Sequence, residues 1–380
     1  MPSQKLQFPC CCLSTAANKW KSFLLILVAS VLLCLLSANW TSQSIFSYKW
    51  QCGELPYRFP DSIPPLVHWT SKDGRVPAKL IPIVRSWRRL LDVRLNDSSS
   101  ADRNSSNADE FPTDRWHFMH WDDKQISELI SKHYPYLVQS YRKLVNGLER
   151  SDIGRLVVLH HVGGLYIDTD VELHRDPTPL LRPSQLQGAG LTPNFDCESA
   201  VWSQEPTEHA VFTFNLPALI SNAVMMSRAK HSFLNFVLKN WPAWFNQNWA
   251  KKVFRSHLDA FRVTGPRMLH TFYEKYTALK KSDRPADWCG NMLAEADAFQ
   301  PIWDVAWIPD RLKSLCKKAE KLSPLQRRHC KRLNGTKFST KQIPNRSFTV
   351  HRFMHLSYRG RLRMATSPIS SILPIFGCRL

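Results

Sequence analysis

The chain has 380 residues, of which 43% are hydrophobic, so it can bury a substantial core in one large domain or two smaller ones. Its formal charge of +20 comes from 51 basic and 31 acidic residues that are spread along the whole sequence. No zinc-finger spacing, RNA-binding aromatic run or basic-zipper pattern accompanies this charge, which argues against nucleic-acid binding and leaves anionic lipids or substrates as partners.

The first forty residues have the pattern of a membrane anchor. The uncharged run FLLILVASVLLCLLSA extends from Phe23 to Ala38, with Trp20 and Trp40 on either side. Lysines precede this run, so the positive-inside rule predicts a cytosolic N-terminus and a lumenal remainder. A cleaved signal peptide is the alternative, but the polar segment before the run is long. We predict a cytosolic tail at 1–22, a transmembrane signal anchor at 23–40, a stem at 41–62 and a lumenal domain at 63–380.

The short span is typical of the thinner membranes of the early secretory pathway, so we expect a single-pass type II protein of the Golgi or ER. Six cysteines follow the predicted anchor, and an even number fits an oxidising lumen. Six cysteines allow fifteen pairings, so the pattern leaves their connectivity open. They are Cys52, Cys197, Cys289, Cys316, Cys330 and Cys378.

Helices and strands begin to alternate after the stem. LVHW at 66–69 predicts a strand, and a basic helix follows at 79–94 with Ile83, Trp87, Leu90 and Leu91 on one face. The polar, serine-rich segment at 96–110 predicts a surface loop. RWHFMHW at 115–121 predicts a second strand, after which Asp122-Asp123 can cap a helix.

The most informative segment is SDIGRLVVLHHVGGLYIDTDVEL at 151–173. Ser151-Asp152 predicts the N-cap of a helix that continues through His161, and Gly163-Gly164 ends that helix before a strand, LYID. This alternation predicts an α/β fold with a mixed, mainly parallel sheet flanked by helices.

Asp168 and Asp170 follow that strand at its carboxyl end, where open α/β sheets bind their ligands. Positions i and i+2 of a strand point to the same side, so both carboxylates can bind one hard cation, Mn²⁺ or Mg²⁺. The cation would neutralise a leaving diphosphate as a Lewis acid.

Asp152 and Arg155 occupy i and i+3 of the preceding helix, and the double glycine lets that helix turn back toward the strand end. Aspartate can bind sugar hydroxyls, and the arginine fork can bind sugar and phosphate.

The pattern SDxxRxxxLxxxGGxYxDxD resembles the DXD-containing sugar-binding region of glycosyltransferase family 32, in particular its Golgi α-mannosyltransferases and their inositol phosphorylceramide mannosyltransferase branch. IPPLVHWT at 63–70 and WHFMHWDD at 116–123 are also similar to that family, as are SNAVMMSRAKHSFL at 221–234 and TGPRML at 264–269. The resemblance covers residues 63–270.

This resemblance implies a GT-A-type (Rossmann-like) fold, a divalent metal and retention of the anomeric configuration. It implies that Asp168 and Asp170 contact the metal and diphosphate, that Asp152 and Arg155 contact the donor sugar, and that Trp69 lies near the nucleoside. Front-face substitution, assisted by the leaving phosphate, would need no protein nucleophile.

The expected function is a metal-dependent hexosyltransferase that acts on a glycolipid or glycoprotein glycan. GDP-mannose is the favoured donor, and a UDP-hexose such as UDP-galactose or UDP-N-acetylglucosamine is the alternative. A non-catalytic glycan-binding membrane protein and a sugar-phosphate hydrolase are the other hypotheses.

Several residues have both a structural and a functional interpretation. His351 and His355 resemble the family's late histidine segment, but Ser357-Tyr358 replaces its Ser-Trp, so we expect structural histidines. His160 and His161 are expected to pack rather than to bind metal, and Glu172 to be a solvated strand residue. Arg267 is either a ligand of an acceptor or phosphate, or simply part of a helix start beside Pro266.

Overall fold

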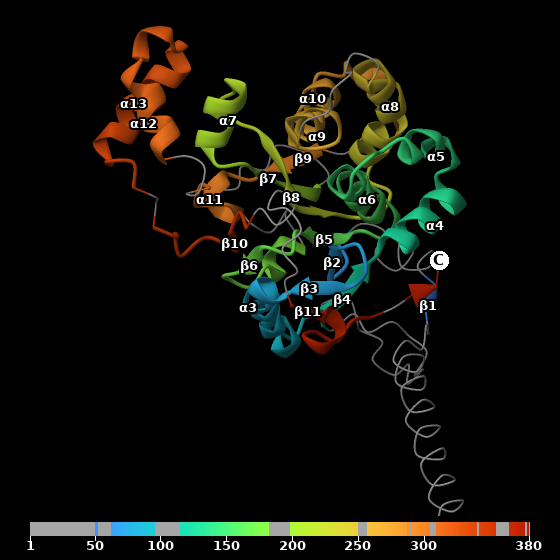
Figure 1. The fold of residues 1–380 in the computed structure, drawn as a ribbon. Helices are drawn as coiled ribbons and strands as arrows, with labels where there is room; N and C mark the ends of the chain where they lie inside the picture. The colour runs from blue at the N-terminus through green and yellow to red at the C-terminus, as the bar shows by residue number, and fades with distance from the viewer. Residues whose placement is uncertain are drawn as a thin grey trace, which may run out of the picture. The chain divides into compact units, whose positions relative to one another are not determined.

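A six-stranded sheet in the order β4-β2-β5-β8-β7-β9 forms the centre of the structure (Figure 1). The structure is a computed structural model in which the described residues belong to one compact unit, Lys49–Leu380. Those residues are 50–51, 62–95, 115–181, 198–249, 257–286, 288, 290–304, 309–339, 342–354, 365–376 and 378–379. The central strands are β2 (Leu66–Thr70), β4 (His117–Trp121), β5 (Gly164–Ile167), β7 (Glu198–Gln204), β8 (Ile220–Ser227) and β9 (Gly290–Leu293).

The sheet is mixed and mainly parallel, as the sequence predicted. β2 pairs in parallel with β4 and with β5, and β7 pairs in parallel with β9. β8 is antiparallel to both of its neighbours, β5 and β7, so it is the single reversed strand of this sheet. The strand ends of β2, β5 and β7 therefore meet at one edge of the sheet.

Hydrophobic side chains cover both faces of the sheet. Successive residues of one strand enter different clusters: Tyr166 packs with the helices of one face, whereas Leu165 and Ile167 pack on the other. Burial on both faces explains why these strands are almost continuously apolar rather than alternating.

One face is covered by α4, α5, α6, α8, α9 and α10, and the other by α3 and the short elements around it (Figure 1). The helices are α3 (Ile81–Ser86), α4 (Asp123–His133), α5 (Pro135–Arg142), α6 (Gly147–Val162), α7 (Thr207–Phe214), α8 (Ser232–Trp249), α9 (His257–Val263), α10 (Pro266–Thr277), α11 (Ala296–Phe299), α12 (Pro309–Lys317) and α13 (Pro324–Gly335). Smaller strands pair at the periphery: β1 (Trp50–Gln51) with β12 (Cys378–Arg379), β3 (Arg75–Pro77) with β11 (Thr366–Pro368), and β6 (Val171–Leu173) with β10 (Thr349–His351).

The predicted basic helix at 79–94 is helical but not continuous. It consists of a 3₁₀ turn at Ala78–Leu80, α3, and a second 3₁₀ segment at Trp87–Asp92. Its predicted face is correct for Ile83, Trp87 and Leu90, which are buried. The predicted cap of α4 is also confirmed, because Asp122 and Gln125 form a reciprocal capping box.

The predicted start of α6 is wrong. Ser151 and Asp152 lie inside the helix, which begins at Gly147, with Asn146 as its N-cap. The Asn146 side chain accepts a hydrogen bond from the backbone N–H of Glu149 at 2.8 Å, which satisfies one of the free donors of the first turn. Asp152 is therefore more than a turn inside the helix, and its carboxylate is available for contacts with other elements.

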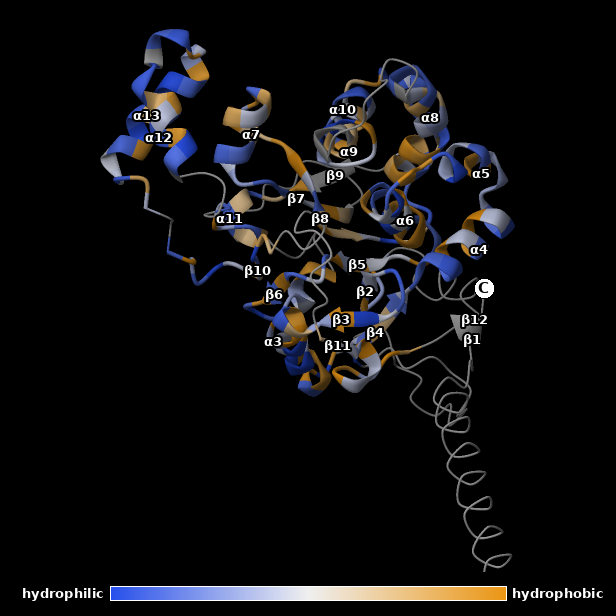
Figure 2. Ribbon diagram, in the orientation of Figure 1, coloured by the Kyte–Doolittle hydropathy of each residue, from blue (hydrophilic) through white to orange (hydrophobic). Residues whose placement is uncertain are grey.

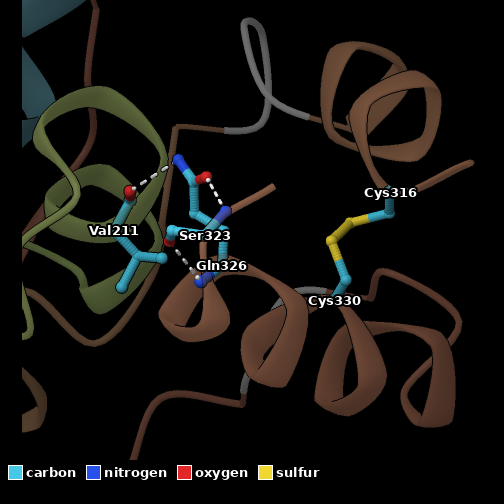
Figure 3. Close-up of a disulfide and its surroundings, with 5 residues drawn as sticks. All are labelled: Val211, Cys316, Ser323, Gln326 and Cys330. Atoms are coloured by element: carbon cyan, nitrogen blue, oxygen red, sulfur yellow. Dashed lines mark hydrogen bonds between the residues drawn. A yellow bond between two sulfur atoms is a disulfide. The ribbon is translucent and has the colours of Figure 1, made fainter. Parts of the chain in front are cut away.

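Helices α12 and α13 form a hydrophilic hairpin that is closed by a disulfide between Cys316 and Cys330 (Figures 2 and 3). Ser323 caps α13 through a capping box with Gln326, whose Nε2 also donates to the Val211 carbonyl of α7 at 3.3 Å. The hairpin is thus connected to α7, and the disulfide agrees with the predicted oxidising compartment.

Several predictions lie outside the described residues: the tail at 1–22, the anchor at 23–40, most of the stem at 41–62, and the polar loop at 96–110. Among the helices that the structure does describe, none has the length and apolar character needed to cross a membrane.

Candidate active site

Asp168 and Asp170 lie in the turn that joins β5 to β6, at the carboxyl edge of the sheet. The turn is held by a hydrogen bond from the Val171 N–H to the Asp168 carbonyl at 3.0 Å, and by one from the Asp168 N–H to the Ala223 carbonyl at 2.9 Å. The expectation that the two carboxylates converge is confirmed, but its reason was wrong. They converge through a turn after Ile167 and not through the alternation of a strand.

His351 completes this group from a distant part of the sequence. β10 runs antiparallel to β6 and places His351 opposite Val171. The Nε2 atom of His351 lies 3.2 Å from Oδ1 of Asp170, and the Met354 N–H donates to the other oxygen of Asp170 at 2.9 Å. The structure thus places His351 beside Asp170, and its role, structural or metal-binding, stays a prediction, whereas His355 lies outside the described residues.

The charges of His351 and Asp170 depend on each other. Burial by itself would lower the pKa of His351, but the nearby Asp170 carboxylate raises it to about 9. Burial would likewise raise the pKa of Asp170, but the His351 imidazolium and the Met354 N–H bring it down to about 2. Without a metal ion, the two groups thus form a charged pair.

Asp168, Asp170 and His351 each offer a ligand atom, and these atoms lie within 4.8 Å of one another. Two carboxylates and one imidazole form a donor set that binds divalent metals in proteins. An ion entering between them would displace the proton of His351, since an imidazole binds metal only in its neutral form. The residues present therefore fit a divalent cation.

Arg155 connects α6 to the group formed by Asp168, Asp170 and His351. Its Nη1 lies 3.0 Å from Oδ1 of Asp168 and donates to the Asn222 carbonyl at 2.7 Å. Its Nε donates to the Ser151 carbonyl at 3.2 Å, and its Nη2 lies 3.3 Å from Oδ1 of Asp152. The Arg155 guanidinium is thus held by four residues of the protein, and it in turn holds the Asp168 carboxylate in one orientation.

Asp152 is buried, and both of its oxygens accept hydrogen bonds. Asn222 Nδ2 donates to one at 2.8 Å and the Thr264 hydroxyl to the other at 2.9 Å. Burial raises the pKa of Asp152 to about 6, against the lowering effect of Arg155. The structure therefore brings Asp152 and Arg155 together with Asp168, and it connects them to the turn before α10.

A chain of hydroxyl groups that the sequence pattern did not reveal supports Asp168. Tyr166 donates to Oδ1 of Asp168 at 2.8 Å and also bonds Thr70 at 2.9 Å, and Thr70 bonds Ser151 at 2.8 Å. The Arg155 guanidinium lies over the Tyr166 ring, 4.8 Å from its centroid. The tyrosine of the GGxYxDxD pattern was the signal for this role.

The double glycine makes the return from helix to strand sterically feasible. Gly163 and Gly164 have φ values of +78° and +109°, which residues with a side chain rarely adopt. A Cβ on Gly163 would lie 2.6 Å from the Ala229 nitrogen, and one on Gly164 would lie 2.7 Å from the Leu66 oxygen. The predicted hinge is confirmed.

The remaining candidates lie apart from this group. Trp69 is fully buried against Trp87 and Phe118, so its placement near a nucleoside stays a prediction. His160 is buried with its Nδ1 2.7 Å from the Tyr134 hydroxyl, and His161 is buried beside it, as expected for packing. Glu172 is not merely solvated, since Arg352 Nε donates to it at 2.7 Å.

The family model of the glycosyltransferase sugar-binding region containing a DXD motif matches residues 99–187. Asp152, Arg155, Asp168 and Asp170 lie in this range, so the predicted resemblance is confirmed on the residues that carried it.

The chain is also similar to characterised yeast proteins. It is 23% identical to inositol phosphoceramide mannosyltransferase 3 of Schizosaccharomyces pombe over 64% of this chain and 49% of the relative. It is 23% identical to the mannosyl phosphorylinositol ceramide synthase CSH1 of Saccharomyces cerevisiae over 57% of this chain and 44% of the relative. The chain thus spans about half the length of these relatives.

Among solved structures, the UDP-bound glycosyltransferase domain of the YGT toxin aligns with a TM-score of 0.37 and 12% identity, over 75% of this chain and 92% of that domain. The PaToxG glycosyltransferase aligns with a TM-score of 0.33 and 14% identity, over 61% of this chain and 76% of that one.

Proposed function

We propose that this chain is a metal-dependent, retaining glycosyltransferase that moves a hexose from a sugar nucleotide to a glycolipid or glycoprotein glycan. The observation that carries the proposal is the convergence of Asp168, Asp170 and His351, with ligand atoms within 4.8 Å of one another, at the carboxyl edge of the sheet. The match of residues 99–187 to a sugar-binding region supports it.

Asp168, Asp170 and His351 would hold the cation. The imidazole favours Mn²⁺ over Mg²⁺, which prefers an all-oxygen environment. When bound, the cation supplies Lewis acidity toward the diphosphate of the donor. Asp170 is fixed by the Met354 N–H, and Asp168 by Tyr166 and Arg155, so the protein holds its ligands before the cation arrives.

Asp152 and Arg155 would orient the donor sugar. Both are buried. Asp152 accepts hydrogen bonds from Asn222 and Thr264, and Arg155 donates to the Asn222 carbonyl, which holds both residues beside Asp168. The guanidinium would also stabilise the charge that develops on the departing diphosphate. Trp69, in β2, would lie near the nucleoside of the donor.

Mannose is the favoured sugar and GDP-mannose the favoured donor, because one similar yeast protein is named as a mannosyltransferase and the other as a mannosyl phosphorylinositol ceramide synthase. A UDP-hexose is the alternative. The acceptor of those relatives is named as inositol phosphoceramide, and the basic chain charge of +20 suits an anionic acceptor.

The membrane topology and the cellular location are proposed from the sequence. We propose a GT-A-type domain from residue 63 onward, attached through a stem at 41–62 to a type II anchor at 23–40, with a cytosolic tail at 1–22, in the Golgi or ER membrane. The disulfide between Cys316 and Cys330 supports a lumenal location.

The test uses the purified full-length chain in detergent with Mn²⁺, Mg²⁺ or EDTA. GDP-mannose, UDP-galactose, UDP-glucose and UDP-N-acetylglucosamine are offered one at a time, and nucleotide release and metal-dependent binding are measured. We expect one donor to be cleaved with Mn²⁺ and none with EDTA. The enzyme proposal fails if no donor is turned over and none binds in a metal-dependent way.

The same assay separates the other hypotheses. A non-catalytic glycan-binding protein would bind glycans without releasing any nucleotide. A hydrolase acting on sugar phosphates would release inorganic phosphate instead of a nucleoside diphosphate.

A further inference from the structure

A pocket with a mixed polar and apolar lining lies between four helices on the side of the sheet that carries α10. It has a volume of about 440 Å³ and is bounded by the C-terminal end of α7, by α8, by α9 and by the first turns of α10. Figure 1 shows these helices above β7 and β8. This pocket plays no part in the metal-binding group described above.

Two arginines line this pocket without a partner among the described residues. Arg262 is exposed, and Arg267 is partly buried, with its Nη1 atom fully buried and unbonded. The single acidic residue of α10, Glu274, contacts His270, with its Oε1 3.5 Å from the His270 Nε2. An unpaired guanidinium nitrogen that is closed off from water is costly, which indicates that a ligand supplies the missing acceptor.

The other walls of the pocket are also suited to an anion with an attached organic group. Trp244 lines it together with Phe214, and the Nε1 of Trp244 is a second buried donor without a partner in the described residues. Lys275 lies over the Trp244 ring, 5.5 Å from its centroid, and adds a third positive charge nearby. Thr271 and Asn248 offer polar side chains.

The pocket is connected to the proposed donor site through a short segment of chain. Thr264 donates to Asp152 at 2.9 Å, and Gly265 caps α10, of which Arg267 is the second residue. Only Gly265 and Pro266 separate Thr264 from Arg267 along the chain. The turn at 264–265 therefore links the proposed donor site to the helix that carries Arg267.

We infer that Arg262 and Arg267 bind a phosphate or phosphodiester group of the acceptor. Arginine forks match phosphate oxygens in geometry and charge, and the aromatic wall accommodates the organic part of the same molecule. This inference rests on the proposed glycosyltransferase function and adds to it the place where the acceptor is recognised. The donor diphosphate binds elsewhere, at Asp168 and Asp170.

The experiment measures phosphate binding by the full-length chain in detergent, with EDTA and without any donor, so that the metal-binding group does not contribute. The probes are myo-inositol 1-phosphate and vesicles of phosphatidylinositol in phosphatidylcholine, with pure phosphatidylcholine as the blank. We expect Arg262→Gln/Arg267→Gln to bind at least about ten-fold more weakly, the effect of losing one charge-assisted hydrogen bond. Weakening with both probes indicates recognition of the phosphate itself, and weakening with the vesicles alone indicates a lipid headgroup.

The matched control is Arg142→Gln/Lys280→Gln, which removes two exposed positive charges elsewhere. Thermal midpoints check that the variants fold. The inference is overturned if the wild-type chain binds neither probe, or if the arginine variant binds both as tightly as the control. Mn²⁺-dependent nucleotide binding is measured separately and is expected to be unchanged, so a failure of the donor site is distinguished from a failure of this pocket.

Discussion

The Arg155 guanidinium and the Asp168 carboxylate form an ion pair, with Nη1 3.0 Å from Oδ1, across the hinge between α6 and β5. Arg155 is nearly buried, whereas Asp168 remains partly accessible, with 27% of its side chain exposed. The pair therefore joins the core of the domain to the edge where a ligand can enter. Substitutions on either side of this pair should affect both stability and ligand binding.

Asp170→Asn is expected to abolish metal-dependent donor binding. The substitution removes a negatively charged ligand and leaves His351 without the carboxylate that lies 3.2 Å from it. A loss of stability of about 1–2 kcal/mol should accompany it, because a buried hydrogen-bonded charge pair is broken. Titration calorimetry with Mn²⁺ and nucleotide provides the measurement. Asp310→Asn, at a fully exposed position, is the control, and normal sugar transfer by the Asp170 variant would show that the site is assigned wrongly.

His351→Ala is expected to weaken Mn²⁺ binding by roughly 10–100-fold, the range found when metal-site partners are removed. The variant retains both carboxylates of the turn, so residual binding should remain. Metal titrations followed by nucleotide release test this. The exposed His174 supplies the matched variant, His174→Ala, and equal metal affinity in the two proteins would return His351 to a structural role.

Arg155 can be tested by charge-conserving and charge-removing changes. Arg155→Met should destabilise the fold by about 3–5 kcal/mol, because it leaves the buried Asp152 without its cation. Arg155→Lys keeps the charge but cannot reach Asp168, Asn222 and Ser151 together, so it should lose transfer activity at a smaller cost in stability. Denaturation curves and donor turnover are compared with those of Arg150→Lys in the same helix. A fully active lysine variant would contradict the need for the fork.

Gly164→Ala is expected to cost at least about 2 kcal/mol and to displace the turn that carries Asp168. Its φ of +109° opposes a side chain, and a methyl group added at this position would lie 2.7 Å from the Leu66 oxygen. Gly147→Ala is the ideal contrast, since a Cβ there meets no atom within 4 Å and alanine favours a helix. Chemical denaturation of the two variants gives the comparison, and similar stabilities would refute the steric explanation.

His68 should make stability depend on pH. Its Nε2 donates to the Gly163 carbonyl at 2.7 Å while its Nδ1 accepts from Trp121 Nε1 at 3.1 Å, an arrangement that requires a neutral ring. Burial lowers the pKa of His68 from 6.5 to about 4. Between these values the unfolded chain binds the additional proton, so stability falls as the pH drops from 6.5 toward 4, by about 3 kcal/mol for this residue.

Denaturation curves measured from pH 7 to pH 4 test the role of His68. His120, His160 and His161 have pKa values lowered by burial as well, so the wild-type chain should lose stability steeply. His68→Gln should show a smaller slope than the wild type, and His174→Gln should not. Identical slopes in all three proteins would exclude His68 as a contributor.

Local sequence patterns were sufficient for much of the architecture. The strands at 66–69 and 115–121, the cap at Asp122 and the glycine hinge are fixed by nearby residues, and they are confirmed. The start of α6 was misplaced because Ser151-Asp152 and Asn146 are both good caps. The fold selects Asn146, since a helix that starts there places Asp152 against Asn222 and Thr264.

The sequence by itself determined that Asp152, Arg155, Asp168 and Asp170 belong to one unit, because a helix, two glycines and a strand bring them together over short distances along the chain. Only the tertiary structure decided that His351 joins them, since 181 residues separate it from Asp170 and the pairing of β10 with β6 closes that distance. It likewise decided that Arg262 and Arg267 line a pocket with α7 and α8, because helices far apart in the sequence form its walls. Periodicity and capping act over a few residues, whereas a binding site is assembled by contacts between distant segments.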